Sequence, residues 1–419
     1  LFSDGSAVTA DDVVYSFNAA KGSATEYAYK LYGAVSAAAS GGKTVVFNLA
    51  KADPYFVNLI DFPIVKKGSE ARADEDGKAL PPIGAGRYVS DDGMTKLTAN
   101  TKYYGGSLNI NEIRLINAPD SESVSHYVEV GAADMYYSDI SDGNIVRMSG
   151  KKVSINLNRI VFIGVNKAYG ELANAELRQA ISSGIDRKAI CRDGYYNNAL
   201  AANGFFNPKW QPVKSVQSIE TTANKEITIE NLEKIGYNSV DANGIRKNSG
   251  GQRLEFELLV NSENRVRVFA AQLIANQLFE YGIKIRIAEK SFADYTAALV
   301  SGNFQLYLGE VAITPNMDLT NLVAEGGSAA YGAAASKPDV TADTASDTAS
   351  DAPAEETAQS VSAAELINGF YSGTNTVNDV ASVLQAEMPF IPVCYRTGVL
   401  FYNDNIENVN NSSLSDIYF

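Results

Sequence analysis

The single histidine of the chain, His126, limits the catalytic chemistry that the sequence can support. A Ser-His-Asp triad, a Cys-His pair and a histidine-bearing zinc site would each depend on this one residue. His126 stands in segment 123–129, whose pattern is typical of the start of a surface helix. We therefore expect it to be a solvated or capping residue, and we expect no histidine-based catalysis.

Two cysteines, Cys191 and Cys394, are the other candidates for reactive chemistry, and they lie far apart in the sequence. Two thiols alone make neither a disulfide framework nor a structural zinc site, so we interpret them as buried thiols. The sequence has no Gly-rich phosphate loop and no Gly-x-Ser-x-Gly elbow, and no catalytic pair stands out among its 49 acidic residues. The sequence therefore predicts no enzyme, no cofactor and no metal site, with a hydrolase as a less favoured alternative.

The composition is that of a globular protein. A chain of 419 residues is long enough for two or three domains, and 45% of its residues are hydrophobic against 20% charged. The net charge of −14 disfavours a nucleic-acid partner, which would require a basic face. No run of about 18 apolar residues occurs, so no membrane-spanning helix is expected.

Strands and helices alternate in the second half of the chain, which favours parallel βαβ units and hence an α/β fold. The pattern predicts strands at 254–260, 283–287 and 304–308, with helices at 265–281 and 292–299 between them. Further elements are expected at 43–49, 112–116, 159–165 and 389–395 for strands, and at 174–193, 363–371 and 379–387 for helices.

Residues 333–360 differ from the rest of the chain in composition, because they are almost entirely Ala, Ser, Thr, Asp, Glu and Pro. Such a segment cannot bury a core, so we predict a disordered acidic insertion, with a functional tether as the alternative.

The first residues also carry information. Residues 1–5 show no charged n-region and no apolar h-region, so they do not form a signal peptide. Thr9 and Asp12 form an acidic box of the capping type that opens a helix at once. This start is typical of the middle of a domain, and we expect the natural N-terminal part to be missing.

Several segments resemble one known family. Residues 2–13, FSDGSAVTADDV, are similar to the segment fsDGtplTAeDV of the extracytoplasmic solute-binding proteins of ABC importers, family 5, the peptide/nickel type. Residues 82–88, PIGAGRY, are similar to its PvGTGPY, with departures at Ala85 and Arg87. Further similar segments follow in the family's order at residues 102–106, 131–135, 162–166, 176–187, 232–237 and 389–392.

The resemblance implies a periplasmic-binding-protein-like fold (type II, cluster C), in which two α/β lobes enclose the ligand. Mapped onto this chain, lobe one is residues 1–158 plus 397–419, incomplete at its N-terminus, and lobe two is residues 159–396. The two crossovers between the lobes then lie near residues 159–166 and 395–398.

The resemblance also implies a function. The expected protein is a monomeric receptor that captures a small solute, peptide or peptide-like, and delivers it to ABC permease subunits in the membrane. It would work outside the cytoplasm, in the periplasm or lipid-anchored at the cell surface, with its signal sequence outside this chain. A ligand-sensing domain of a regulator is the alternative.

The candidate ligand-binding residues begin with the stretch 304–318. Peptide-binding relatives carry an ammonium-binding aspartate there, and an ungapped comparison puts Thr314 at its position. The nearest carboxylates, Glu310 and Asp318, bracket an apolar centre, so we expect a ligand with a cationic or hydroxylated end. The alternatives are a solvated loop residue for Glu310 and a helix cap for Asp318.

Five further residues are expected at the cleft. Phe206 and Trp210 are candidates for stacking on the ligand, with core packing as the alternative. Tyr395 and Arg396 stand at the second crossover, and Asn166 ends the first crossover strand, where it would bind ligand or act in the hinge.

Overall fold

The computed structural model describes residues 1–139, 150–216, 219–332, 362–407 and 409. The acidic insertion expected at 333–360 and the tail 410–419 lie outside these residues. Within the described chain, no helix is both long and apolar enough to cross a membrane.

A seven-stranded mixed sheet is the centre of the described structure. Strand β11 pairs in parallel with β12 and β13, whereas β7 pairs antiparallel with β13 and β14, and β14 with β6. The order is β12 (Lys284–Lys290), β11 (Glu255–Asn261), β13 (Leu306–Ala312), β7 (Lys151–Val165), β14 (Phe390–Tyr402) and β6 (Met135–Ser138), with β8 (Ala199–Ala201) beside β14. Strand β11 ends and β13 begins with four consecutive buried residues, as expected where a sheet is covered on both faces, whereas the edge strand β12 contains no buried residue.

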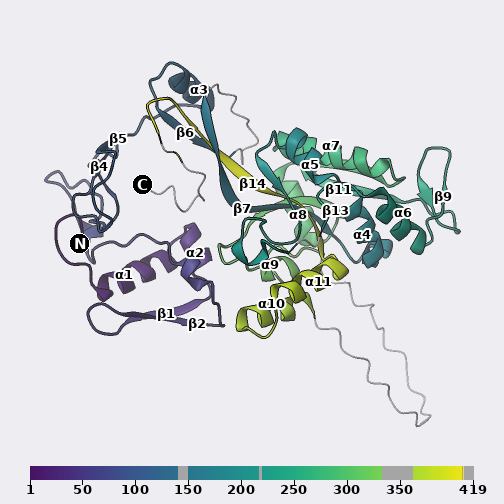
Figure 1. The fold of residues 1–419 in the computed structure, drawn as a ribbon, viewed down its shortest axis with the longest axis horizontal. Coiled ribbons are helices and arrows are strands. Elements are labelled where there is room, and N and C mark those ends of the chain that lie inside the picture. The colour runs from purple at the N-terminus through teal and green to yellow at the C-terminus, as the bar shows by residue number, and fades with distance from the viewer. Residues whose placement is uncertain (140–149, 217–218, 333–361, 408, 410–419) are drawn as a thin grey trace, which may run out of the picture.

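The helices between these strands follow local capping signals. Asn264 caps α7 (Arg265–Phe279), and Ser291 caps α8 (Phe292–Ser301), which Gly302 ends in a left-handed conformation. Other helices of this lobe are α4 (Ala175–Ser183), α5 (Arg187–Ala189), η4 (Ile190–Gly194), α6 (Lys225–Lys234), α9 (Thr320–Val323), α10 (Ala363–Ser372) and α11 (Val377–Glu387). Figure 1 shows α7 and α5 on one side of the sheet and α9, α10 and α11 on the other.

The N-terminal residues form a separate, smaller body. Helix α1 (Ala10–Lys21) and the hairpin β1 (Ala34–Ala39)–β2 (Val45–Leu49) pack around Phe17, which is fully buried. The expected Thr9–Asp12 capping box is present at the start of α1. The remaining elements are α2 (Glu26–Lys30), η1 (Phe56–Leu59), η2 (Ser69–Ala71), the sheet β3 (Tyr88–Ser90)–β4 (Lys96–Ala99)–β5 (Glu112–Arg114), and α3 (Ser121–Glu129).

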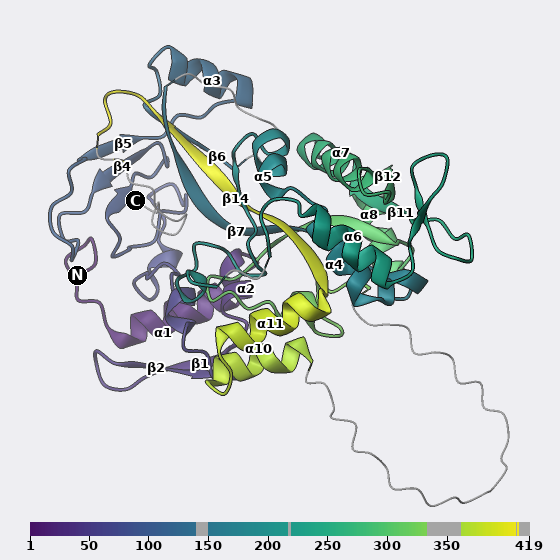
Figure 2. The ribbon, with the colours of Figure 1, turned by 45° about the vertical axis from the view of Figure 1, so that its right-hand side comes forward.

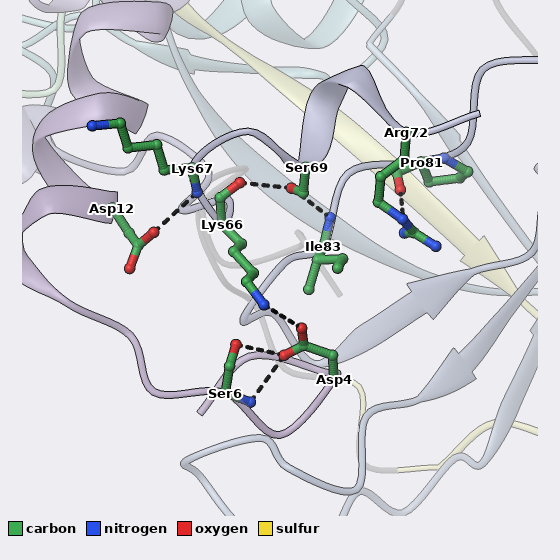
Figure 3. Close-up of polar contacts among 9 residues, drawn as sticks. All are labelled: Asp4, Ser6, Asp12, Lys66, Lys67, Ser69, Arg72, Pro81 and Ile83. Carbon is green, nitrogen blue, oxygen red and sulfur yellow. Dashed lines mark hydrogen bonds and ion pairs between the residues drawn. The ribbon is translucent and has the colours of Figure 1, made fainter.

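The start of the chain is tied to residues 66–69 of the same body (Figure 3). Lys66 Nζ donates to Asp4 Oδ2 at 2.7 Å, and this hydrogen bond is the main cause that lowers the pKa of Asp4. Asp12 Oδ1 accepts from the backbone N–H of Lys67 at 2.9 Å, and Ser69 Oγ donates to the carbonyl of Lys66. These contacts fix the loop against α1.

Strands β7 and β14 are the long connections between the two bodies (Figure 2). They pair antiparallel along most of their length, from Phe390 opposite Gly164 to Tyr402 opposite Lys151. Residues 159–165 of the first expected crossover lie in β7, and the second, at 395–398, lies in β14. The bounds 1–158 plus 397–419 for lobe one and 159–396 for lobe two stay a proposal.

One expected element differs in the structure. The helix expected at 174–193 is interrupted: α4 ends at Ser183 with Gly184 as its cap, and the chain restarts at Asp186, whose side chain caps α5. The apolar stripe is continuous in the sequence, but a local glycine and a capping carboxylate divide the helix.

Candidate functional site

Two neighbouring cavities lie between lobe one and lobe two. Their volumes are about 660 Å³ and about 650 Å³, and both are bordered by Tyr29, Lys30 and Thr314. Residues of lobe one line one side, and the loop after β13 lines the other. A ligand site bounded by two bodies and placed at the carboxyl end of a sheet strand is the usual arrangement in α/β proteins.

The loop after β13 supplies two of the predicted residues. Thr314 borders both cavities, and Asp318 borders the second. Asp318 Oδ1 accepts from the backbone N–H of Thr320, the first residue of the short helix α9, whose N-cap position is Leu319. The turn between them depends on Met317, whose φ of 60° lies in the left-handed region, and which is buried at 1% exposure.

Asp53 joins this loop to lobe one. Asn316 Nδ2 donates to Asp53 Oδ2 at 2.8 Å, and Asp53 and Asp318 both border the second cavity. Burial raises the pKa of Asp53, and the negative charge of Asp318 acts in the same direction. Tyr371 supports the loop from behind, because its hydroxyl donates to the carbonyl of Asn316 at 2.7 Å.

A group of aromatic rings packs beside the first cavity. Tyr55 of lobe one packs edge-on against Trp210 at 5.1 Å between ring centroids and stacks on Phe370 at 5.9 Å. Trp210 borders the first cavity, whereas Phe206 stacks behind it at 5.3 Å and is 4% exposed. Of the two predicted stacking residues, Trp210 faces the cleft and Phe206 packs into the core.

Glu310, on β13, is surrounded by three arginines from other elements. Its Oε2 accepts from Arg267 of α7 at 3.0 Å and from Arg396 of β14 at 3.1 Å, while Arg159 of β7 lies 3.9 Å from Oε1. The Glu310 side chain is 4% exposed and that of Arg396 is 1% exposed. The carboxylate of Glu310 is therefore already engaged by cations of the protein itself.

Two predicted residues lie in the packed interior. Tyr395 is fully buried and donates to the carbonyl of Phe205 at 2.7 Å, and burial raises its pKa. Asn166 donates to the carbonyls of Gly302 and Phe304. It stands at the far end of β7 from Arg159, because Val165 pairs with Leu306 whereas Arg159 pairs with Ala312. The structure brings Thr314, Asp318 and Trp210 to the cleft, pairs Glu310 with Arg396, and separates Asn166 from all of these.

Sequence reasoning missed Asp53, Tyr55, Arg159 and Arg267. For Arg267 a signal exists, because it lies just after the carboxyl end of β11, next to β13. No local pattern marks Asp53 or Tyr55, which reach the cleft from a different lobe.

The histidine and the cysteines lie outside the cleft. His126 is exposed on α3. Cys191 and Cys394 are buried free thiols, which confirms that prediction, and burial raises the pKa of Cys394. Among the described residues, no three acidic, histidine or cysteine side chains are grouped to hold a metal ion.

A third cavity, of about 720 Å³, lies within lobe two between α4, α6 and α11. Its buried cation, Arg187, donates to the carbonyls of Pro392, Ser182 and Glu220. Burial lowers the pKa of Arg187 to about 10. These contacts satisfy its guanidinium, so we place the candidate site between the lobes.

Two lobes joined by two long strands, with cavities between them, define a two-lobe binding protein. The chain belongs to the bacterial extracellular solute-binding proteins, family 5, whose sequence model matches residues 1–331. The resemblance found in the sequence and the expected α/β two-lobe fold are thereby confirmed.

Individual relatives are distant. The oligopeptide-binding protein AppA of Bacillus subtilis is 24% identical over 302 residues, which are 68% of this chain and 55% of that protein. This chain therefore matches little more than half the length of that relative.

Solved structures show the same fold. NikA from Brucella suis in complex with Fe(III)-EDTA has a TM-score of 0.70 at 15% identity, over 98% of this chain and 83% of that one. The nickel ABC transporter protein from Bacillus halodurans has a TM-score of 0.71 at 17% identity, over 97% and 81%. AppA from Bacillus subtilis in complex with a nonapeptide has a TM-score of 0.58 at 18% identity, over 100% and 84%.

Proposed function

We propose that this protein is a substrate-binding receptor of an ABC importer. It would capture a small solute, peptide or peptide-like, between its lobes and deliver it to permease subunits in the membrane. The observation that carries the proposal is the pair of cavities lined from both lobes and bridged by the Asn316–Asp53 hydrogen bond. Membership of the family and the names of its relatives support the same role.

The two long strands support a closing motion. Ligand capture by such proteins requires hinge movement at a few residues. Strand β14 pairs with β7 along lobe two and with β6 at its other end, so a hinge placed in β7 and β14 would let the 51–55 segment approach the loop after β13. The Asn316–Asp53 and Tyr55–Trp210 contacts are then the contacts that closure forms.

The proposal includes a location and a chemistry. The receptor works outside the cytoplasm, in the periplasm or anchored by a lipid at the cell surface, and it acts as a monomer. It binds its solute without turnover. Membership of a family of solute-binding proteins supports binding without turnover.

Trp210 gives a direct test, because it is the only tryptophan and it borders the cleft. Native mass spectrometry of the purified protein should identify co-purified solutes, and each should change the Trp210 fluorescence in a saturable way. The solute should be recovered intact after prolonged incubation. Two outcomes would refute the proposal. In one, none of the co-purified solutes binds in the cleft. In the other, the protein converts a solute and this activity is lost when a cleft residue is mutated.

A further inference from the structure

The group of Glu310 with Arg159, Arg267 and Arg396, here called the arginine cluster, contains more positive than negative charge. Glu310 is the acidic partner in all three ion pairs. Arg396 also donates to the backbone carbonyl of Asp139. Within these ion pairs of the described residues, three guanidiniums therefore face one carboxylate.

Several buried donors of this cluster have no partner. Arg267 Nε and Arg396 Nε are buried and make no hydrogen bond among the described residues, and neither does the hydroxyl of Tyr195. The guanidinium of Arg396 lies over the Tyr195 ring at 5.4 Å, so these donors belong to one place. Arg396 and Tyr195 are each 1% exposed. A buried polar group without a partner is costly, and an excess buried cation more so, which points to a missing anionic group.

The cluster is connected to the cleft through Arg159. This residue borders the cavity of about 660 Å³ and also lies 3.9 Å from Glu310. Its side chain is 43% exposed, whereas that of Arg267 is 13% exposed, so the cluster runs from the cavity wall into the interior. Arginine binds carboxylates with fixed, often bidentate geometry, which suits recognition of an anionic end group.

We propose that the arginine cluster binds a carboxylate group of the solute, with Glu310 as a positioning residue that holds Arg267 and Arg396 in place. This inference rests on the proposed receptor function and names the chemistry of its ligand. The ligand charge proposed here is opposite to the one expected from the sequence. The sequence suggested that the Glu310 carboxylate binds a cationic ligand group, whereas in the structure the arginines around Glu310 would bind an acidic one.

The test uses the full chain with sodium citrate and sodium succinate as probes and sodium chloride at equal ionic strength as the reference. Thermal unfolding and Trp210 fluorescence are followed as the carboxylate concentration rises. We expect a saturable rise in melting temperature with the carboxylates beyond that with chloride. Arg267→Gln should weaken carboxylate binding about 10- to 150-fold, since one hydrogen bond between charged groups is lost.

Two further variants complete the design. Arg159→Gln removes the cation at the cavity wall and should weaken binding in the same direction, while leaving the buried pair of Glu310 and Arg396 intact. Arg286→Gln is the matched control, because Arg286 is also paired with a glutamate, Glu255, but lies on β12, the edge strand of the sheet. It should bind the probes like the parent.

The outcomes separate this inference from the receptor function. If the parent responds to carboxylates as it does to chloride, or if Arg267→Gln and Arg159→Gln both respond like the parent, the carboxylate site is refuted. A co-purified solute that binds with equal affinity to parent and Arg267→Gln would leave the receptor function standing and overturn the inference. Absence of any cleft ligand would instead refute the receptor function.

Discussion

Asn316 donates a hydrogen bond of 2.8 Å to Asp53, and the two residues lie 263 positions apart in the chain. This contact joins the loop after β13 to lobe one at the border of the second cavity. Asn316 is buried and Asp53 is half-buried, so the bond is partly shielded from water. It is therefore a direct probe of the contact between the lobes.

Replacing Asn316 by alanine should weaken that contact. We expect a loss of about 1–2 kcal/mol in the free energy of unfolding, since a hydrogen bond to a half-buried charged group is lost. Urea denaturation should show a lower midpoint at an unchanged slope. Asn48→Ala is the matched control, because Asn48 donates to Ser36 within an exposed hairpin, and its loss should be much smaller. Equal losses in the two variants would contradict the proposed importance of the bridge.

Asp53 should make stability depend on pH. Its folded pKa is raised above its ordinary value of 3.8 by burial, so the native state binds this proton more tightly than the unfolded chain. Asp53 therefore adds to the free energy of unfolding at pH values below its pKa in the unfolded chain. This contribution is lost as the pH rises through its higher pKa in the folded protein. Asp53→Asn removes the titration, so the variant should gain stability relative to the parent as pH rises through that window. Urea denaturation across a pH series measures the difference, and a difference that does not change with pH would contradict the assignment.

Glu310 should matter far more for stability than a comparable surface glutamate. Glu310→Gln leaves Arg267 and Arg396 buried without their acidic partner, which should cost about 3–5 kcal/mol. Glu255→Gln is the control, because Glu255 also pairs with cations, Lys284 and Arg286, but Lys284 is half-exposed and Arg286 is exposed. This substitution should lower the free energy of unfolding by less than about 1 kcal/mol. Similar unfolding free energies for the two variants in urea would show that the arginine cluster is not buried as described.

Gly164 should not tolerate a side chain. A Cβ at this position of β7 would meet the ring of Tyr307, which lies opposite on β13, at 1.9 Å. Gly164→Ala should therefore destabilise the protein by about 1–3 kcal/mol through overpacking. Gly33→Ala, where a Cβ would meet nothing within 4 Å, is the control and should be close to neutral in thermal unfolding. A Gly164→Ala variant as stable as the parent would mean that Tyr307 packs elsewhere.

The fold was predictable where the signal is local. The alternation that predicted strands at 254–260, 283–287 and 304–308 corresponds to β11, β12 and β13, since period and capping residues are properties of short segments. The break after Ser183 was not predicted, because the apolar stripe continues across it and only Gly184 and Asp186 mark the end and the restart.

The candidate site was predictable only in part. Thr314 and Asp318 follow the carboxyl end of a predicted strand, a position that indicates ligand sites without any knowledge of the rest of the fold. The engagement of Glu310 by arginines could not be predicted, because Arg267 and Arg396 come from a helix and a strand whose approach depends on the sheet order. Asp53 and Tyr55 depend on how the two lobes meet, which no local pattern encodes.

Tyr55 provides the last prediction, because its ring joins lobe one to the aromatic residues of lobe two. It packs on Trp210 and Phe370 at centroid distances of 5.1 and 5.9 Å, and aromatic pairs of this kind each contribute about 0.5–1.5 kcal/mol beyond area burial. Tyr55→Ala should therefore loosen the contact between the lobes and expose Trp210 to water.

Three readouts follow from that change. The Trp210 emission of Tyr55→Ala should shift to the red, acrylamide should quench it more strongly, and small-angle scattering should show a larger radius of gyration. Tyr55→Phe is the matched control, since it keeps the ring that makes both contacts and removes only the hydroxyl, and it should match the parent in all three measurements. If Tyr55→Ala keeps the parent's emission and radius of gyration, the aromatic contact does not hold the lobes together, and the contact between them must depend on the polar bridge from Asn316 to Asp53 instead.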